Sequence, residues 1–208
     1  MNDSKGWLVP LTGAAFIVVA IIGFIVGGEP KDASHPATEI ADWYIDNKDS
    51  VEVGAFIGVA ATVLLVFFGA YLRNVLRVAA GGDDMLSLVS FIGVVVVAIG
   101  FSIDATISLA IAERADDIDP IAVQSLQALW DNDFIPIALG TLLFLWATGI
   151  SVVRSGALPK WIGWIMLLLG VVALTPLGFA SFIGTAVLIL VISILLAVRA
   201  RSATPAAA

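Results

Sequence analysis

The stretch MLSLVSFIGVVVVAIGFSIDATISLAIA, residues 85–112, is almost entirely apolar and carries a single charged side chain, Asp104. A transmembrane helix needs about 20 consecutive and mostly apolar residues to cross the hydrocarbon core of a bilayer. This stretch is longer than that minimum, so it predicts a spanning helix that tilts or projects from the membrane.

Further apolar segments of similar length predict five more spans, at Trp7–Val26, Val53–Leu72, Phe134–Val153, Trp161–Leu177 and Phe179–Val198. The chain is 60% hydrophobic and 13% charged, whereas a soluble domain is about 45–50% apolar and about 25% charged. The predicted fold is therefore all-α, a six-helix transmembrane bundle that forms one domain over residues 1–200. Residues 201–208 are of low complexity and predict a disordered tail.

The segment Thr175–Gly178 predicts a tight turn between the last two spans. Proline lacks the backbone donor that a helix interior needs, and glycine tolerates unusual backbone dihedrals. The alternative is a kink inside one re-entrant segment. We favour the turn because the whole apolar run is too long for one span.

The distribution of basic residues predicts the orientation. With six spans, one side of the membrane holds Lys5, Arg73, Arg77, Arg154, Lys160, Arg199 and Arg201, and the other holds Lys31, Lys48 and Arg114. Cytoplasmic loops carry the excess of lysine and arginine. Both termini are therefore expected in the cytoplasm, and the protein in the cytoplasmic membrane.

Thirteen of the 17 acidic residues fall in the two outer loops: Glu29, Asp32, Glu39, Asp42, Asp46, Asp49, Glu52, Glu113, Asp116, Asp117, Asp119, Asp131 and Asp133. Such an acidic face attracts cations or basic partners and repels anionic head groups and nucleic acid. Simple solvation of exposed loops explains the same pattern. No nucleic-acid partner is expected in either case.

Each outer loop also contains a predicted short amphipathic helix. The first covers Pro36–Asn47, and the second begins at Asp119, a good N-cap residue, followed by Pro120. Apolar residues recur at helical spacing in both segments. We expect these helices to lie on the outer membrane surface or to cap the bundle.

Asp104 is the sharpest candidate for a functional residue, with Ser108 one turn further out on the same face. A carboxylate in hydrocarbon is costly, so it should face the bundle interior or a water-filled cavity, or be protonated. No Lys, Arg or His lies at a matching depth in another span, which leaves donors such as Thr141 or Thr175. Three interpretations of Asp104 then remain. It is a cation or proton site, a polar clasp that holds two helices together, or a carboxylate partly exposed to water because the long helix leaves the membrane before its end.

Other residues have predicted structural roles. Two G-x-x-x-G pairs allow close helix approach: Gly23 with Gly27, and Gly54 with Gly58. Three tryptophans at the predicted cytoplasmic boundary are expected to anchor the helices in the interface: Trp7, Trp161 and Trp164.

The sequence offers no support for an enzyme. It has no cysteine and only one histidine, His35, and it contains no phosphate-binding loop, dinucleotide fingerprint, nucleophile elbow or zinc-protease motif. We therefore expect no catalytic residue, no metal site and no cofactor.

Three strings in the second half resemble a family of small bacterial multi-pass membrane proteins of unknown function. They are LGTLLF at residues 139–144, RSGALPKWIGW at 154–164 and LTPLGF at 174–179. The resemblance implies a six-span protein of the bacterial cytoplasmic membrane and assigns no functional residue.

Three functions remain open. The leading hypothesis is a non-enzymatic subunit or regulator that acts through another membrane protein or a homo-oligomer within the lipid bilayer. The second is a small cation- or proton-coupled transporter or channel in which Asp104 titrates. The third is a sensor of lipid or a small ligand.

Overall fold

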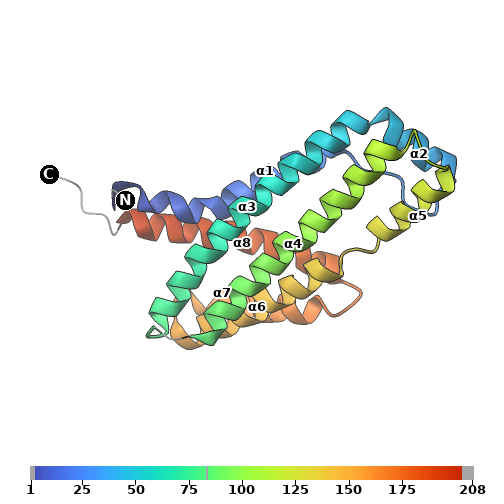
Figure 1. The fold of residues 1–208 in the computed structure, drawn as a ribbon. Helices are drawn as coiled ribbons and strands as arrows, with labels where there is room; N and C mark the ends of the chain where they lie inside the picture. Colours follow the sequence, from blue (N-terminus) through green and yellow to red (C-terminus); the bar gives the residue numbers. More distant parts are fainter. Residues whose placement is uncertain (1–2, 83, 203–208) are drawn as a thin grey trace.

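The computed structural model describes residues 3–82 and 84–202, with side chains from Gly6 onward. These residues form helices joined by short turns, without any strand, which confirms the predicted all-α bundle (Figure 1). The helices are η1 (Asp3–Leu11), α1 (Thr12–Gly27), α2 (Ala37–Asp46), α3 (Lys48–Ala79), α4 (Met85–Arg114), α5 (Pro120–Trp130), α6 (Ile135–Ser155), α7 (Lys160–Val172) and α8 (Gly178–Ser202).

Five helical segments of the described chain are long and apolar enough to cross a membrane: Gly6–Gly27, Lys48–Ala79, Met85–Arg114, Pro120–Ser155 and Gly178–Ser202. The sixth predicted span corresponds to α7, which has only 13 residues and ends at Val172 rather than at Leu177. The six-span count is therefore roughly consistent with the structure, whose described residues form five long apolar segments and one shorter apolar helix.

The early end of α7 follows from Pro176. A residue that precedes proline avoids the helical conformation, and Thr175 instead caps the preceding turn by donating its hydroxyl to the carbonyl of Val172 at 2.7 Å. Residues 173–177 form the turn, after which α8 packs back against α7. The two helices are separate, as predicted.

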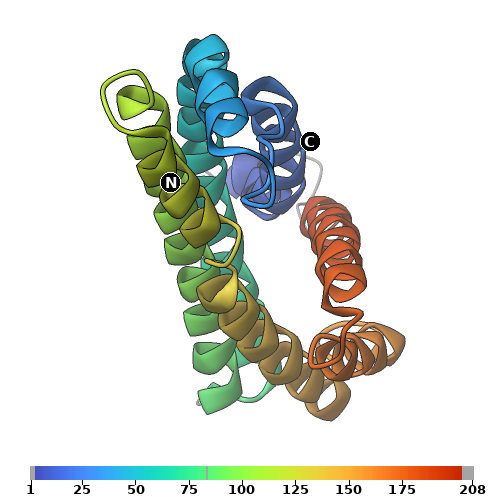
Figure 2. The same ribbon diagram turned by 90° about the vertical axis from the view of Figure 1, so that its right-hand side faces the viewer.

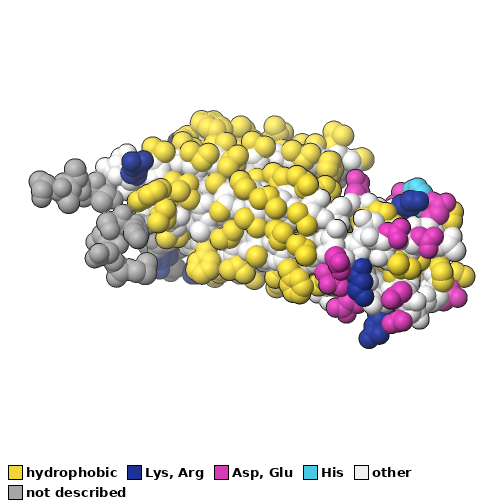
Figure 3. Space-filling view, turned by 90° about the horizontal axis from the view of Figure 1, so that it is seen from above, with side chains coloured by type: hydrophobic (Ala, Val, Ile, Leu, Met, Phe, Trp, Pro, Cys, Tyr) yellow, Lys and Arg dark blue, Asp and Glu magenta, His cyan; other side chains and the backbone are white. Residues whose placement is uncertain are grey.

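The helices follow one another around the bundle. Contacts run from α1 to α3, α4, α6, α7 and α8 in order, and α8 closes the circuit by packing on η1 and the first part of α1 (Figure 2). The start of η1 and the end of α8 lie at the same end as the α3–α4 and α6–α7 turns (Figure 1). An apolar surface covers the middle of the molecule, and acidic side chains gather at the opposite end (Figure 3).

Two of the helix contacts depend on glycine. A Cβ atom added to Gly54 on α3 would lie 2.6 Å from the backbone nitrogen of Gly27 and 2.8 Å from the oxygen of Gly23, both on α1. Between α4 and α6, one added to Gly93 would lie 2.7 Å from the oxygen of Gly140. Both pairs of backbones therefore approach to a distance that only glycine permits.

The two outer helices form a cap. Helices α2 and α5 pack against each other and against the outer ends of α3 and α4. A hydrophobic cluster fills this cap. It is made of Ile40, Ala41, Tyr44, Val51, Ile111, Ala112, Ala115 and Val123. Capping of the bundle is therefore the alternative that the structure favours, because the apolar faces of these helices are covered by protein.

The end of the chain differs in part from the prediction. Helix α8 continues through Arg201 and Ser202, so the predicted tail does not begin at residue 201. The hydroxyl of Ser202 donates to the carbonyl of Val198 at 3.0 Å, which continues the helical turn. Residues 203–208 lie outside the described part of the chain.

We predict that Gly54→Ala lowers the stability of the fold, because its methyl group would collide with the backbone of α1. Overpacking of this kind costs about 1–3 kcal/mol. Gly58→Ala is the matched control, since a Cβ at Gly58 meets no atom within 4 Å. Thermal unfolding of the purified proteins, followed by circular dichroism, measures the difference. Equal melting temperatures for the two variants would contradict the close contact.

Candidate ligand-binding site

Asp104 lies where the apolar surface of α4 ends. The large exposed apolar side chains of this helix are Met85, Leu88, Ile92, Ile99 and Ile103. At about 1.5 Å per residue, the distance from the first to the last is about 27 Å, close to the ~30 Å thickness of the hydrocarbon core. Asp104 follows directly after Ile103 and therefore lies at the end of an apolar surface long enough to cross a bilayer, where α4 continues into the cap.

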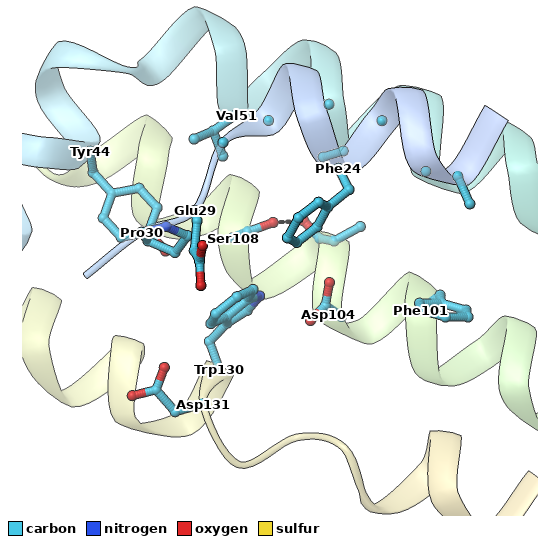
Figure 4. Close-up of a pocket in the computed structure, with 18 of the residues that line it drawn as sticks. Phe24, Glu29, Pro30, Tyr44, Val51, Phe101, Asp104, Ser108, Trp130 and Asp131 are labelled. Carbon is cyan, nitrogen blue, oxygen red and sulfur yellow. Dashed lines mark hydrogen bonds between the residues drawn. The ribbon is translucent and has the colours of Figure 1, made fainter. Parts of the chain in front are cut away.

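A cavity of about 410 Å³ opens beside Asp104, between α1, α3 and α4 and under the cap (Figure 4). Its lining contains four carboxylates, from Glu29, Asp32, Asp104 and Asp131. It also contains six aromatic rings, from Phe16, Phe24, Trp43, Tyr44, Phe101 and Trp130. No lysine, arginine or histidine lines it in the described part of the chain. The cavity is thus both acidic and aromatic.

The Asp104 carboxylate is partly buried and points into this cavity, as does the Trp130 ring (Figure 4). No hydrogen bond or ion pair joins Asp104 to any described residue, and the hydroxyl of Thr175 is used within its own turn. The interpretation of Asp104 as a polar clasp between helices is therefore not supported. Two interpretations remain, a cation or proton site and a carboxylate partly exposed to water. Both agree with the position of Asp104 at the cavity and at the end of the apolar surface of α4.

Ser108 lines the same cavity, but it does not pair with Asp104. Its hydroxyl donates to the carbonyl of Ala105 at 3.1 Å, within α4. The indole nitrogen of Trp130 is buried and has no acceptor among the described residues. The wall around Asp104 therefore leaves the carboxylate without a donor.

The rim of the cavity is formed by the segment that joins α1 to α2. Asp131 accepts hydrogen bonds from the backbone nitrogen of Ala33 and from Nε2 of Gln127, each at 2.8 Å. At Asp32, hydrogen bonds from Ser34 hold the pKa of the exposed carboxyl below its usual value. The Asp32 carboxylate therefore carries negative charge at neutral pH.

A buried hydrogen bond holds the two cap helices together over the cavity. The hydroxyl of Tyr44 on α2 donates to Oε1 of Gln127 on α5 at 2.7 Å, and both side chains are fully buried. Burial, with the nearby Asp131 carboxylate as a second cause, raises the pKa of Tyr44 above its usual value. The phenol therefore stays neutral and remains a donor to Gln127.

The predicted packing glycines lie at the inner wall of this cavity. Gly23, Gly27, Gly54 and Gly58 all line it, because the close contact of α1 and α3 removes side chains from that wall. A Cβ at Gly23 would lie 3.2 Å from the backbone nitrogen of Gly58. The four residues thus combine close packing with space for a ligand.

The predicted tryptophan anchors lie far from the cavity. Trp161 and Trp164 are exposed on α7, near the basic end of the molecule. Trp7 lies in η1, and its ring centre is 5.8 Å from the guanidinium carbon of Arg201. Their positions agree with a role at the inner interface, and they take no part in the candidate site.

Most charged and aromatic residues of the cavity were not singled out as site residues, among them Glu29, Trp43, Trp130 and Asp131. The sequence places them in outer loops and helices, where acidic residues are expected to be solvated. Their only signal was the presence of an acid and a tryptophan in both outer segments. Because they come from two loops about 100 residues apart, only the fold brings them together.

Comparisons of the chain with protein-family models, with curated proteins and with solved structures find no match. Membership of the family of small bacterial membrane proteins that the second half resembles therefore stays a prediction. The function has to be argued from the site itself.

We predict that Tyr44→Phe destabilises the cap, because it leaves Oε1 of Gln127 buried without its donor. Leaving a buried polar group unpaired costs about 1–3 kcal/mol. Tyr71→Phe is the control: Tyr71 is half-buried, and its hydroxyl makes no hydrogen bond to any described residue. Hydrogen exchange of α2 and α5 measures the effect, and unchanged protection in Tyr44→Phe would show that the bond does not hold the cap.

Proposed function

We propose that this protein is an integral membrane protein that binds an organic cation from the outer side, in the cavity beside Asp104, as a small cation transporter. The observation that carries the proposal is the Asp104 carboxylate, which points into an acidic and aromatic cavity without a hydrogen-bond or ion-pair partner among the described residues. A bound cation would supply the missing opposite charge.

Electrostatics and shape both favour a cation. Four carboxylates line the cavity, and the described lining contains no basic side chain. Aromatic faces attract cations as well, and rings arranged around a site recognise quaternary ammonium groups in particular. Trp43, Tyr44 and Trp130 supply such faces here.

The size of the cavity favours an organic cation over a metal ion. Its volume of about 410 Å³ lies in the ~300–1,000 Å³ range typical of small-molecule sites. A metal ion needs several oxygen ligands within about 2.6 Å. Among the described residues, no three acidic or histidine side chains lie close enough together to hold one.

We further propose that the acidic cap faces outward and that both termini lie in the cytoplasm of a bacterial cell. Arg73, Arg77 and Arg154 lie near the ends of α3 and α6, opposite the cap. The positive-inside rule places that end in the cytoplasm. The cavity would then be filled from outside the cell.

The hypothesis of a subunit or regulator acting through another membrane protein stays a prediction. No contact or surface in the described part of the chain adds to it. Native mass spectrometry after gentle extraction tests it, because a stoichiometric second protein would support a subunit.

We predict that Asp104→Asn weakens binding of tetramethylammonium, because it removes the charge at the centre of the cavity. The expected loss is about 10- to 100-fold, or about 1.4–2.8 kcal/mol. Isothermal titration calorimetry of the protein in phosphatidylcholine nanodiscs measures the affinity. Asp116→Asn is the control for net charge, since Asp116 is exposed in the α4–α5 loop and does not line the cavity. Equal affinities for the two variants would overturn the role of Asp104.

Transport is tested separately from binding. Proteoliposomes should accumulate labelled tetramethylammonium when the protein is present, and Asp104→Asn should abolish the uptake. Binding without uptake would instead identify a sensor of the same cation.

We predict the labelling pattern of single-cysteine variants, which tests the orientation. Only the introduced thiol can react, because the chain has no native cysteine. Ser34→Cys, exposed in the first outer loop, should react with a membrane-impermeant maleimide in right-side-out vesicles. Ala80→Cys, exposed in the α3–α4 turn, should react only after permeabilisation. The reverse pattern would invert the proposed topology.

A further inference from the structure

A second cavity of about 320 Å³ lies deeper in the bundle, between α1, α3, α4, α6 and α8. Its lining is almost wholly apolar, with side chains such as Leu65, Val97, Phe144 and Ile189. Two threonines contribute hydroxyls. That of Thr185 donates to the carbonyl of Ser181 at 2.8 Å, and that of Thr141 makes no hydrogen bond to any described residue. This cavity therefore offers space for an apolar group and no unpaired charge.

The apolar cavity adjoins the cavity of Asp104. Four residues line both of them: Phe16, Ala20, Phe24 and Phe101. Figure 4 shows Phe101 beside Asp104 on α4, on the side away from the cap. The acidic and apolar spaces thus meet along one wall, with the acidic part at the membrane boundary and the apolar part at membrane depth.

The apolar cavity also reaches the lipid-facing surface. Helices α1 and α8 are joined near their inner ends, where the buried Ser193 hydroxyl donates to the carbonyl of Pro10 at 2.6 Å and accepts from the nitrogen of Ala14 at 2.9 Å. Further out the two helices separate (Figure 2). There Ile21 on α1 and Phe182 on α8 are both exposed and both line the cavity.

We propose that the ligand is a cationic amphiphile with a single alkyl chain, which enters from the outer leaflet between α1 and α8. This inference rests on the proposed cation site and adds the chemistry of the rest of the ligand. The ammonium head lies among the carboxylates and rings beside Asp104, and the chain occupies the apolar cavity. The apolar volume is at the lower end of the range for small-molecule sites, which suits one chain rather than the two of a phospholipid.

Charge excludes the other common amphiphiles. An anionic head group would face four carboxylates without a basic partner in the described lining, and like charges in a site of low dielectric repel strongly. A neutral head group would leave the Asp104 carboxylate unpaired. A cationic head is the one that gains from both the carboxylates and the aromatic faces of the cavity wall.

The test uses ammonium ions with alkyl chains of increasing length, which separates the contribution of the head group to binding from that of the tail. Tetramethylammonium, butyltrimethylammonium and octyltrimethylammonium are titrated below their micellar concentrations into the full-length protein in phosphatidylcholine nanodiscs. Octyl sulfate carries the same tail with the opposite charge. Empty nanodiscs give the bilayer partition that is subtracted from each titration.

Ala186→Phe fills the apolar cavity, because Ala186 lines it from α8. Val187→Phe is the matched control, since its side chain is exposed on the lipid-facing side of the same helix and lines neither cavity. Each buried methylene is worth about 0.8 kcal/mol, so we expect Ala186→Phe to weaken octyltrimethylammonium at least ~10-fold relative to Val187→Phe. Both variants should bind tetramethylammonium as the wild type does.

Several outcomes would overturn the proposal. Equal octyltrimethylammonium affinities in the two variants would show that the tail lies elsewhere. Octyl sulfate binding as tightly as octyltrimethylammonium would show that the head is not selected. Phospholipid retained in the cavity and not displaced by octyltrimethylammonium, seen by native mass spectrometry, would assign it to a two-chain lipid.

The design keeps this failure distinct from that of the proposed function. If tetramethylammonium binds in an Asp104-dependent way but chain length has no cavity-dependent effect, only the amphiphile inference fails. If tetramethylammonium does not bind to the wild type, the cation site itself fails. If Ala186→Phe does not fold, Ile17→Trp fills the same cavity from α1 and replaces it.

Discussion

The hydrogen bond between Tyr44 and Gln127 joins two short helices that share one small hydrophobic cluster with the ends of α3 and α4. Helices α2 and α5 have 10 and 11 residues, and isolated helices shorter than about 12–15 residues are marginal in water. They are stable here because they bury one another and the outer ends of α3 and α4. The roof of the cavity beside Asp104, with Trp43, Trp130 and Asp131, depends on that small cluster.

The cap in turn requires the long central helices. Helices α3 and α4 have 32 and 30 residues, about 48 and 45 Å at the helical rise, whereas a bilayer core is ~30 Å thick. Their excess length stands outside the membrane and carries the cap. Asp104 lies at the transition between the two environments, where a carboxylate can reach both an aqueous opening and an apolar interior. The same helix that crosses the membrane thus places the charged group of the site.

Local features of the fold and the central residue of the candidate site, Asp104, were predictable from the sequence, and the rest of the cavity lining was not. Asp119 and Pro120 predicted the start of α5, and the Asp119 carboxylate does accept from the backbone nitrogen of Ile121 at 2.8 Å, because capping involves neighbouring residues. Hydropathy located the spans, but it placed the end of α7 five residues too far, since apolar turn residues look like helix on a hydropathy scale. The cavity lining comes from five separate segments, and periodicity within any one of them contains no information about the others.

The contact of Ser193 with the start of α1 has a mechanical consequence. It fixes the first and last long helices to each other near their inner ends, through backbone atoms of Pro10 and Ala14, and leaves their outer halves apart. The outer half of α1 is held instead by α3, through the close contact of Gly27 with Gly54. The outer half of α8 is held by α7, where the hydroxyl of Ser181 donates to the carbonyl of Leu169 at 2.8 Å. The gap between the two helices is therefore braced on both sides by different neighbours, so the ring of helices stays open at that point while it is joined at the inner end.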